Sequence, residues 1–191
     1  MGTGKARNTG PSVDLRRRAM FAVWDDDAAL DRFLASSPVA SGWKQAAESW
    51  HVRLRAISGD GTWRGRQIMQ GLEAASENGG PICTLTRADV RIKHWHTFAA
   101  ASRATSLDVA AAKGLLRVVG IGEAPVGKQA TFSIWEDDAA LRQFAYRTAG
   151  HVEVMRRTRQ EGWYAEEMFA RFQPYASTGS WDGTDPLAAA R

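Results

Sequence analysis

Apolar and polar residues alternate along the second half of the chain in a way that predicts four strands separated by helices. The apolar, β-branched runs typical of strands lie at 82–90, 115–121, 130–135 and 163–172. Helical spacing covers 95–113, 138–144 and 152–160, with a break expected within 102–108. The resulting order, strand–helix–strand–strand–helix–strand, is that of a ferredoxin-like unit.

An internal repeat duplicates part of this pattern. Residues 21–33 read FAVWDDDAALDRF and residues 132–144 read FSIWEDDAALRQF, with identical residues at eight of the thirteen positions. Further on, Glu48-Ser49-Trp50 matches Glu161-Gly162-Trp163. Each copy is therefore expected to contain a strand, an acidic helix cap, two helices and a closing strand.

Both copies carry three acidic residues after the shared tryptophan, at 25–27 and 136–138. Carboxylates at a helix N-terminus accept hydrogen bonds from free backbone N–H groups and complement the helix dipole. Capping therefore explains these residues in both copies, and catalysis by the carboxylates is the alternative.

The repeat predicts an α+β protein made of duplicated ferredoxin-like units, in which the two units pair as in a dimeric α/β barrel. The first unit is expected to be N-terminally incomplete, because Gly2-Thr3-Gly4 matches Gly120-Ile121-Gly122 and nothing in the chain matches the elements before it. We expect either an upstream start of translation or completion by another chain. The predicted division is an incomplete first repeat at 1–57, a linker with a short helix near 68–75 at 58–81, a complete second repeat at 82–173 and a flexible tail at 174–191.

Composition narrows the class of protein. The net charge of +4 is spread along the chain and predicts no nucleic-acid partner. The single cysteine, Cys83, excludes an intramolecular disulfide and a structural zinc site built on cysteines. No apolar run is long enough to span a bilayer, so a cytoplasmic location is expected. Eight tryptophans suit a core, or a large pocket for a flat apolar ligand.

Several motifs that could carry chemistry have simpler explanations. Residues 122–128, GEAPVGK, have the spacing of a phosphate-binding loop, but Gln129 replaces the Mg²⁺-binding hydroxyl and a strand follows, so a β-hairpin loop is predicted. His94 and His96 lack a third ligand nearby and mark a helix start. His51 is expected to be structural, and Cys83 a small buried side chain rather than a thiolate ligand.

His151 is the most informative candidate. It opens a predicted helix and shares a face with Val154, Met155 and Thr158 through i+3, i+4 and i+7 spacing. The first copy has no histidine at the matching position, as expected for a single functional site, although drift between copies would also produce this. The neighbouring arginines could pair with anionic groups such as haem propionates, but a solvated basic face is preferred for at least two of them; they are Arg147, Arg156, Arg157 and Arg159.

The segment TFSIWEDDAALRQFAYRTAGHVEVMRRTRQEGWYAEEMFARF at 131–172 is similar to the closing segment of the spheroidene monooxygenase family. LLRVVGIGEAP at 115–125, ICTLTRADVR at 82–91, and AAESWHVRL with TWRGRQ within 46–67 also resemble that family, so that the resemblance covers about 19–173. It implies a haem-dependent monooxygenase that inserts oxygen into an apolar substrate, a carotenoid.

By this resemblance His151 becomes the candidate proximal ligand of the haem iron. The implied partners are the apolar small molecule, dioxygen and an electron donor that the sequence does not identify. Contact with a membrane surface and homo-oligomerisation are both open. Two alternatives remain: a haem-binding α/β-barrel protein without enzyme activity, and a cofactor-free α/β-barrel monooxygenase.

Overall fold

A computed structural model describes residues 2–4, 13–75, 79–124 and 126–188 of the chain. Seven strands form one antiparallel sheet in the order β2-β1-β5-β6-β4-β7-β3. In chain order the strands are β1 (Gly2–Gly4), β2 (Val13–Arg18), β3 (Trp50–Gly61), β4 (Ile82–Val90), β5 (Leu115–Gly122), β6 (Lys128–Trp135) and β7 (Tyr164–Gly179). The helices are α1 (Asp27–Ser36), α2 (Pro38–Trp43), α3 (Trp95–Ala110), α4 (Asp138–Arg147) and α5 (Ala149–Glu161), with a 3-10 turn at Ile92–His94.

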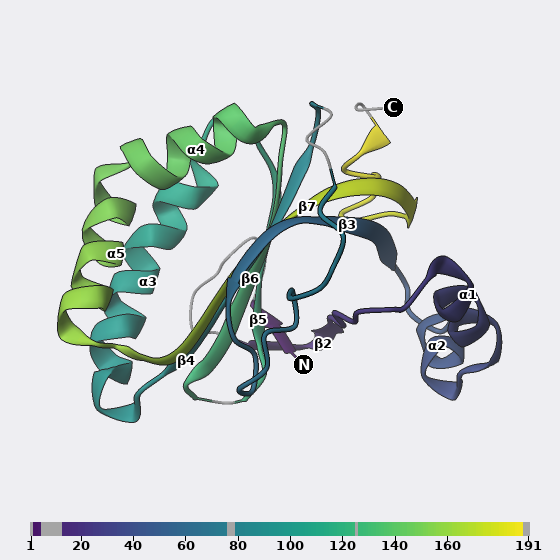
Figure 1. The fold of residues 1–191 in the computed structure, drawn as a ribbon, viewed down its shortest axis with the longest axis horizontal. Coiled ribbons are helices and arrows are strands. Elements are labelled where there is room, and N and C mark those ends of the chain that lie inside the picture. Colours follow the sequence, from purple (N-terminus) through teal and green to yellow (C-terminus); the bar gives the residue numbers. More distant parts are fainter. Residues whose placement is uncertain (1, 5–12, 76–78, 125, 189–191) are drawn as a thin grey trace.

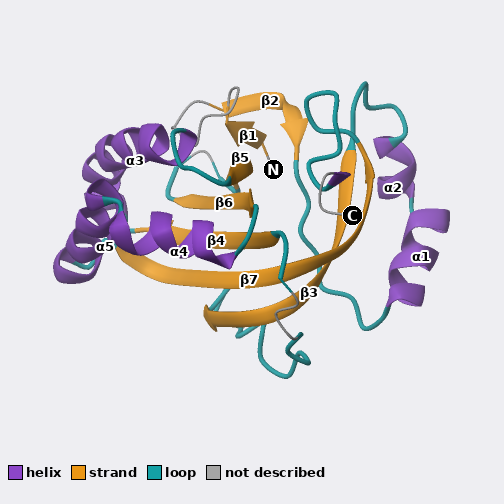
Figure 2. Ribbon diagram, turned by 90° about the horizontal axis from the view of Figure 1, so that it is seen from above, coloured by secondary structure: helices purple, strands orange, loops and turns teal. Residues whose placement is uncertain are grey.

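The helices lie on two opposite sides of the molecule. Figure 1 shows α3, α4 and α5 stacked beside the sheet, and α1 with α2 at the far side, where the long strands β3 and β7 curve away. Figure 2 shows the same separation from above, with the strands in a curled array between the two groups. In the described part of the chain no helix is long and apolar enough to cross a membrane.

The second ferredoxin-like unit is present as predicted. Within it the sheet order is β5-β6-β4-β7, in which the first strand of the unit lies between the third and the fourth. β4 makes eight residue pairs with β6 and eight with β7. The loop at 122–128 connects the antiparallel strands β5 and β6, which confirms the predicted β-hairpin.

The sheet separates two apolar clusters because alternate residues of a strand point to opposite faces. Ile82 and Trp135 pack under α3 and α4 with residues of those helices. Cys83, Leu85 and Ile134 belong to the larger cluster on the other face, which we call the interior cluster. Its further buried members are Ile121, Ala130, Phe132, Met168, Ala170, Phe172 and Leu187.

The acidic caps have the predicted structural role in both copies. The side chain of Asp26 accepts a hydrogen bond from the Ala29 N–H at 2.6 Å, and that of Asp137 accepts one from the Ala140 N–H at 2.7 Å. Each therefore satisfies a backbone donor that the first turn of a helix leaves free.

The prediction of a strand directly before the first acidic cap is wrong. Residues 19–24 have no ladder partner, and the strand in this region, β2, ends at Arg18. The matching strand of the second copy, β6, is hydrogen-bonded to β5 on one side and β4 on the other. The two stretches have similar sequences, but only the one in β6 forms a strand, because only there do neighbouring strands supply backbone partners.

Four other predictions about the bounds of elements are wrong. β3 continues to Gly61, inside the predicted linker, and 68–75 forms turns and irregular chain instead of a helix. α3 runs unbroken through 102–108. The flexible tail is also wrong for 174–188: β7 extends to Gly179 because it pairs with β3 along its length, and Leu187 is buried in the interior cluster.

The two copies are related by an approximate two-fold arrangement that extends beyond the repeat seen in the sequence. β1 pairs with β5 so that Thr3 lies opposite Ile121, its counterpart in the repeat. After β3 and β7 come two similar turns, closed by the bridges Trp63↔Arg66 and Trp181↔Thr184. In these turns Arg64 and Asp182 have the same left-handed φ of 53°.

The paired caps allow a direct comparison between the copies. Asp137→Ala should lower the free energy of unfolding by about 1 kcal/mol, because α4 buries Leu141 and Phe144 in the core. Asp26→Ala should leave the urea midpoint nearly unchanged and only speed amide exchange within α1, because α1 contains no buried residue. If both variants lost the same free energy of unfolding, the prediction that α4 contributes to global stability and α1 does not would be wrong.

Candidate functional site

The most concentrated polar site is a buried charge cluster on the interior face of the sheet. Arg87 of β4 is fully buried and stacks on the ring of Trp63, with its Cζ 5.3 Å from the ring centroid. Its Nε donates to Glu123 Oε1 at 2.8 Å, and its Nη1 donates to Glu166 Oε2 at 2.6 Å. Two carboxylates therefore compensate one guanidinium out of contact with water.

Glu166 of β7 also holds the turn that follows β3. Its carboxylate accepts hydrogen bonds from the N–H of Gly65 at 2.6 Å, the hydroxyl of Thr62 at 2.8 Å and the N–H of Arg64 at 2.9 Å. The bond from Gly65 is the largest cause, and together with those from Thr62, Arg64 and Arg87 it lowers the pKa of Glu166 to about 2. A carboxyl group this acidic is not suited to proton transfer near neutral pH, so its role is to hold the turn.

The same electrostatics act on Arg87. Burial by itself would lower the pKa of Arg87, but the hydrogen bonds to Glu123 and Glu166 outweigh burial and raise it. Arg87 and Glu166 therefore stay charged near neutral pH and hold the turn after β3 in place. Sequence reasoning missed this cluster, because a lone arginine in a strand and two distant glutamates give no local signal that they meet.

Cys83 lies four residues earlier on β4 and points into the interior cluster. It is completely buried, and burial raises the pKa of its thiol to about 12. A thiol with this pKa is not a thiolate near neutral pH, which agrees with the prediction of a small buried side chain.

Helix α5 carries His151, the main candidate for a cofactor ligand. His151 lies in the first turn of α5, but its side chain is outside the part of the chain that the structure describes. Further along the helix, Val154 and Met155 are half-buried and Thr158 is buried, so the predicted row is the inward face of α5. A side chain added at Gly150 would collide with the carboxylate of Asp108, which places this acidic group of α3 against the turn that carries His151.

The other histidines lie at the start of α3 and on β3. His94 lies at the N-terminus of α3, where its Nε2 is buried without a hydrogen-bond partner, and His96 is exposed in the first turn. His51 is exposed on β3, with its ring 5.5 Å from that of Trp43. Among the described residues, no three His, Cys, Asp or Glu side chains gather in a group that could hold a metal ion.

Two of the arginines near His151 form the solvated face expected from sequence. Arg156 pairs with Glu153 at 2.6 Å, and Arg157 pairs with Glu161 at 2.9 Å, all on the exposed side of α5. Exposed pairs of this kind contribute little to stability.

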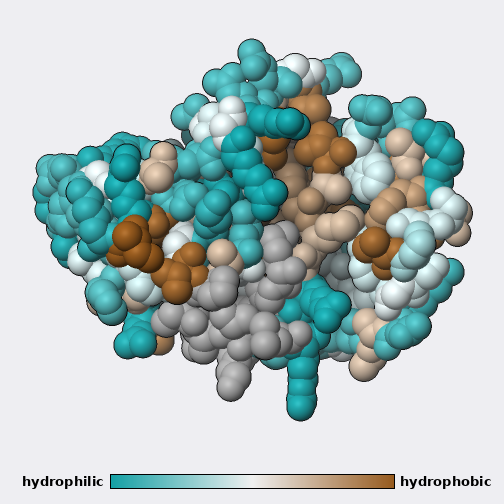
Figure 3. All heavy atoms as spheres, turned by 90° about the horizontal axis from the view of Figure 1, so that it is seen from below, coloured by the Kyte–Doolittle hydropathy of each residue, from teal (hydrophilic) through white to brown (hydrophobic). Residues whose placement is uncertain are grey.

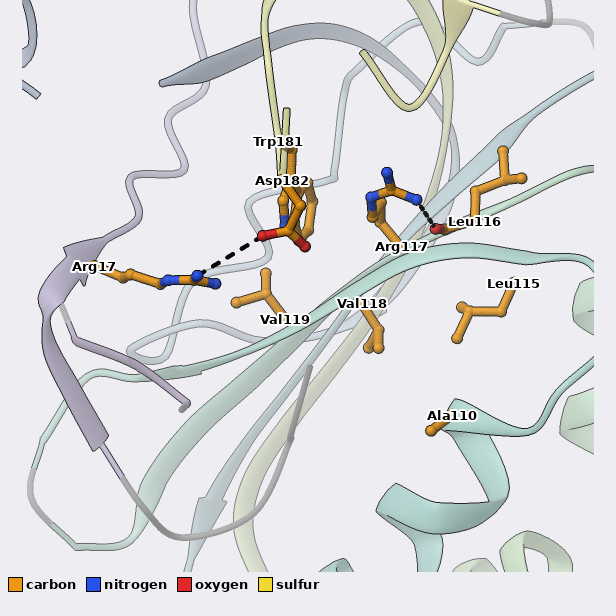
Figure 4. A pocket seen from close by; sticks show the side chains of 9 residues that line it. All are labelled: Arg17, Ala110, Leu115, Leu116, Arg117, Val118, Val119, Trp181 and Asp182. Atoms are coloured by element: carbon orange, nitrogen blue, oxygen red, sulfur yellow. Dashed lines mark hydrogen bonds and ion pairs between the residues drawn. The ribbon is translucent and has the colours of Figure 1, made fainter. Parts of the chain in front are cut away.

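Two cavities lie along the strands β3, β5 and β7. The smaller, of about 90 Å³, lies between β5 and the turn after β7 (Figure 4). There Arg17 approaches Asp182 at 3.7 Å, and Arg117 donates to the Leu116 carbonyl and the Thr184 hydroxyl. The larger, of about 640 Å³, is an open groove on the outer side of β3 and β7 beside Arg55 and Tyr175.

The interior face of the sheet does not fit a haem in this arrangement, because Trp63 and Met69 pack against the interior cluster, to which Leu187 belongs. A haem or a long apolar ligand would have to displace some of these side chains there. The inward row of α5 is a separate position, on which Val154 and Met155 are half-buried and Thr158 is buried.

Apolar side chains also reach the surface. The most exposed large ones are Ile92, Leu107 and Tyr146, each more than 70% exposed. On the face shown in Figure 3, hydrophobic atoms gather in separate groups among hydrophilic ones rather than in one continuous patch.

The strand order and the interior cluster define an α+β protein with a complete ferredoxin-like second unit and a partial first one. A family model described as "Domain of unknown function (DUF3291)" matches residues 76–172. The chain is 35% identical to a spheroidene monooxygenase of Cereibacter sphaeroides over 99% of its own length, and spans 59% of that protein. It is 34% identical to the spheroidene monooxygenase of Rhodobacter capsulatus over 98% of its length, and spans 79% of that protein.

The chain therefore belongs to the spheroidene monooxygenase family, which confirms the resemblance seen in its sequence. A crystal structure of a candidate monooxygenase from Fusobacterium nucleatum is 14% identical, with a TM-score of 0.49 over 85% of this chain and 72% of that chain. A likeness at this level carries no argument about activity.

The pKa of Glu166 predicts how acid affects stability. Since the folded pKa of about 2 lies below the ordinary value of 4.5, ionised Glu166 stabilises the fold above pH 4.5, and this contribution is lost as the pH falls toward 2. Glu166→Gln should lower the free energy of unfolding at pH 7 by about 2–3 kcal/mol and lose less stability between pH 5 and 2 than the unchanged chain.

Urea unfolding at a series of pH values measures both effects. Glu167→Gln is the matched control, because Glu167 is the next residue of β7 and is exposed. If the free energy of unfolding fell with pH equally in Glu166→Gln and in the unchanged chain, ionised Glu166 would not be what stabilises the fold above pH 4.5.

Proposed function

We propose that the chain acts as a monooxygenase on an apolar substrate of the carotenoid type. The observation that carries this proposal is the 34% identity to a spheroidene monooxygenase over nearly the whole chain. Such a reaction places one atom of dioxygen in the substrate and releases the other as water, so it needs two electrons and two protons from a donor. The substrate, the donor and the activity itself are all part of the proposal.

The interior face of the sheet supports an apolar substrate. Its walls are aromatic and aliphatic, and Arg87, the one cation of the charge cluster, is paired with Glu123 and Glu166. In a cofactor-free reaction these residues would exclude water and hold the polyene in place. A haem held by α5 would instead lie on the opposite side of the sheet, with α3 and α4. Glu166 would keep the 62–66 turn closed and supply no proton, because its low pKa keeps its carboxylate ionised.

We propose further that the activity depends on haem and that His151 is the ligand of its iron. A bound haem would supply the activation of dioxygen. What supports this is the inward row of α5, on which the sequence spacing puts His151, and the absence of a matching histidine from the first copy. Asp108, against the same turn, is the described carboxylate best placed to orient an imidazole there.

The apolar interior face favours a second candidate, a monooxygenase of the same fold that uses no cofactor. In that candidate the substrate would displace some of the side chains that fill the interior, and no ligand on α5 would be needed. The third alternative, a haem-binding protein without enzyme activity, would bind haem as the first candidate does but would form no product.

Haemin titration separates these alternatives at the cofactor. A Soret band that saturates at one haem per chain is expected, and His151→Ala should abolish it or weaken binding by at least about tenfold, because a neutral imidazole is the proposed ligand. His51→Ala and His94→Ala are the controls and should keep the band. An unchanged spectrum in His151→Ala would remove His151 as the ligand, and no band at any ratio would leave the cofactor-free candidate.

A measurement of product formation distinguishes a monooxygenase from a haem-binding protein without enzyme activity. A host that makes carotenoids and expresses the chain should accumulate a product heavier than its substrate by one oxygen atom, seen by mass spectrometry with ¹⁸O₂ as the label source. Arg87→Ala is expected to lose this product together with the folded state. His51→Ala should retain product formation. A well-folded, haem-loaded chain that yields no labelled product would favour the haem-binding alternative.

A further inference from the structure

Two apolar side chains fill the interior of the curled sheet from opposite ends. Met69 and Leu187 each lie six residues after the tryptophan of a turn, the first in the turn that follows β3 and the second in the turn that follows β7. Leu187 belongs to the interior cluster, and Met69 packs against it. Because β3 and β7 run antiparallel, the turns that follow them lie at opposite ends of the pair. We call residues 67–70 the first plug and residues 185–187 the second plug.

The second plug is anchored by the carboxylate of Asp185. This group accepts hydrogen bonds from the Ser177 hydroxyl at 2.7 Å, the Trp50 indole N–H at 3.0 Å and the Leu187 N–H at 3.1 Å. Trp50 begins β3 and Ser177 lies near the end of β7, so the second plug is tied to both long strands. Leu187 is accordingly only 5% exposed.

The first plug has no such anchor among the described residues. Gln67 lies four residues after its turn tryptophan, as Asp185 does in the second plug, but Gln67 is exposed. The backbone hydrogen bonds within the plug are local and end on the carbonyls of Arg66 and Gln67. The chain is next bonded to β3 at the N–H of Ala75. The stretch 67–74 is therefore held at its ends and not along its length.

Met69 rests on the backbone of β3 at a notch in the interior face. A Cβ placed on Gly59 would lie 2.7 Å from the Cβ of Met69 and closer still to its Cγ, so only glycine leaves room for this side chain. Ala170 of β7 lies opposite Gly59 in the strand pairing and is completely buried. Two small residues side by side therefore form the notch, and Met69 fills it.

We propose that this notch binds one end of an elongated apolar molecule, and that the first plug swings out to admit it while the second plug stays in place. The inference rests on the proposed apolar substrate, but it requires neither haem nor turnover. The row of the interior face that leads away from the notch is apolar, since Ala170 is followed across the sheet by Leu85 and Phe132. Methionine is unbranched and flexible, so its side chain adapts to a new position more readily than a ring does.

The turn before the first plug limits how far the opening spreads. Glu166 holds 62–65 by hydrogen bonds, and Arg87 stacks on Trp63, so the turn itself stays closed. In the stretch beyond the turn, Gly71 has a φ of 79°, and a Cβ placed there would meet no atom of the described residues within 4 Å. A glycine in open space changes its backbone angles at little cost, so this stretch can move while the turn does not.

Binding of all-trans-retinol, a mainly apolar polyene, tests the notch without dioxygen or an electron donor, and quenching of tryptophan fluorescence measures its dissociation constant. Met69→Ala should bind retinol about tenfold more tightly, because the ligand no longer has to displace a packed side chain. Ala170→Leu should bind it at least about tenfold more weakly, because the larger side chain fills the notch permanently. Met155→Ala is the matched control, since Met155 is a half-buried methionine of α5 on the other side of the sheet.

Thiol labelling shows which plug moves and does not depend on whether Ala170→Leu folds. Saturating retinol should speed the reaction of Met69→Cys with a maleimide several-fold, because the first plug leaves the interior. Leu187→Cys should react slowly with or without retinol, because Asp185 anchors the second plug. The native Cys83 adds little background, because it is completely buried and burial raises the pKa of its thiol to about 12.

The proposal is overturned if no variant binds retinol, or if Met69→Ala binds it no more tightly than the unchanged chain. Equal or slower labelling of Met69→Cys in the presence of retinol would also overturn it, because the ligand would then bind with the first plug closed. A chain that binds and labels as expected but forms no oxygenated product would lose the proposed monooxygenase activity and keep this binding site.

Discussion

A strand persists only when its backbone donors and acceptors have partners on the edges that are removed from water, and this requirement shapes both halves of the molecule. In the second copy, β6 lies between β5 and β4 and its side chains are buried on both faces. In the first copy the matching stretch lacks one neighbour, and the chain from 19 to 24 leaves the sheet. Helix α1 buries no residue, whereas α4, built from nearly the same sequence, buries two.

The copies nevertheless hold each other through their turns. Glu166 of the second copy fixes the turn after β3, and Glu48 of the first fixes the turn after β7. Both turns lie against the interior cluster, where Trp63 and Trp181 contribute apolar surface. Carboxylates that accept several backbone N–H bonds are held in the ionised form, so these contacts fix the rim of the interior and do not provide acid–base groups.

Membership of the spheroidene monooxygenase family and the packing of this chain bear differently on function. The relatives of known name are spheroidene monooxygenases, and the interior face of this chain is apolar, as the proposed substrate is. Helix α5 lies on the opposite side of the sheet from the interior cluster, so a cofactor held by α5 and a ligand held by the apolar interior would occupy different sides of the sheet.

The sequence by itself was enough to predict the helices and strands of the second unit and the hairpin at 122–128. It also predicted the helix caps at Asp26 and Asp137 and the burial of Cys83. Each of these depends on residues close in sequence or on the burial of an apolar surface. Tertiary structure alone decided that 19–24 is not a strand, that 174–179 extends β7, and that Arg87 meets Glu123 and Glu166. Those outcomes depend on hydrogen-bond partners and opposite charges supplied from distant parts of the chain, which no local spacing encodes.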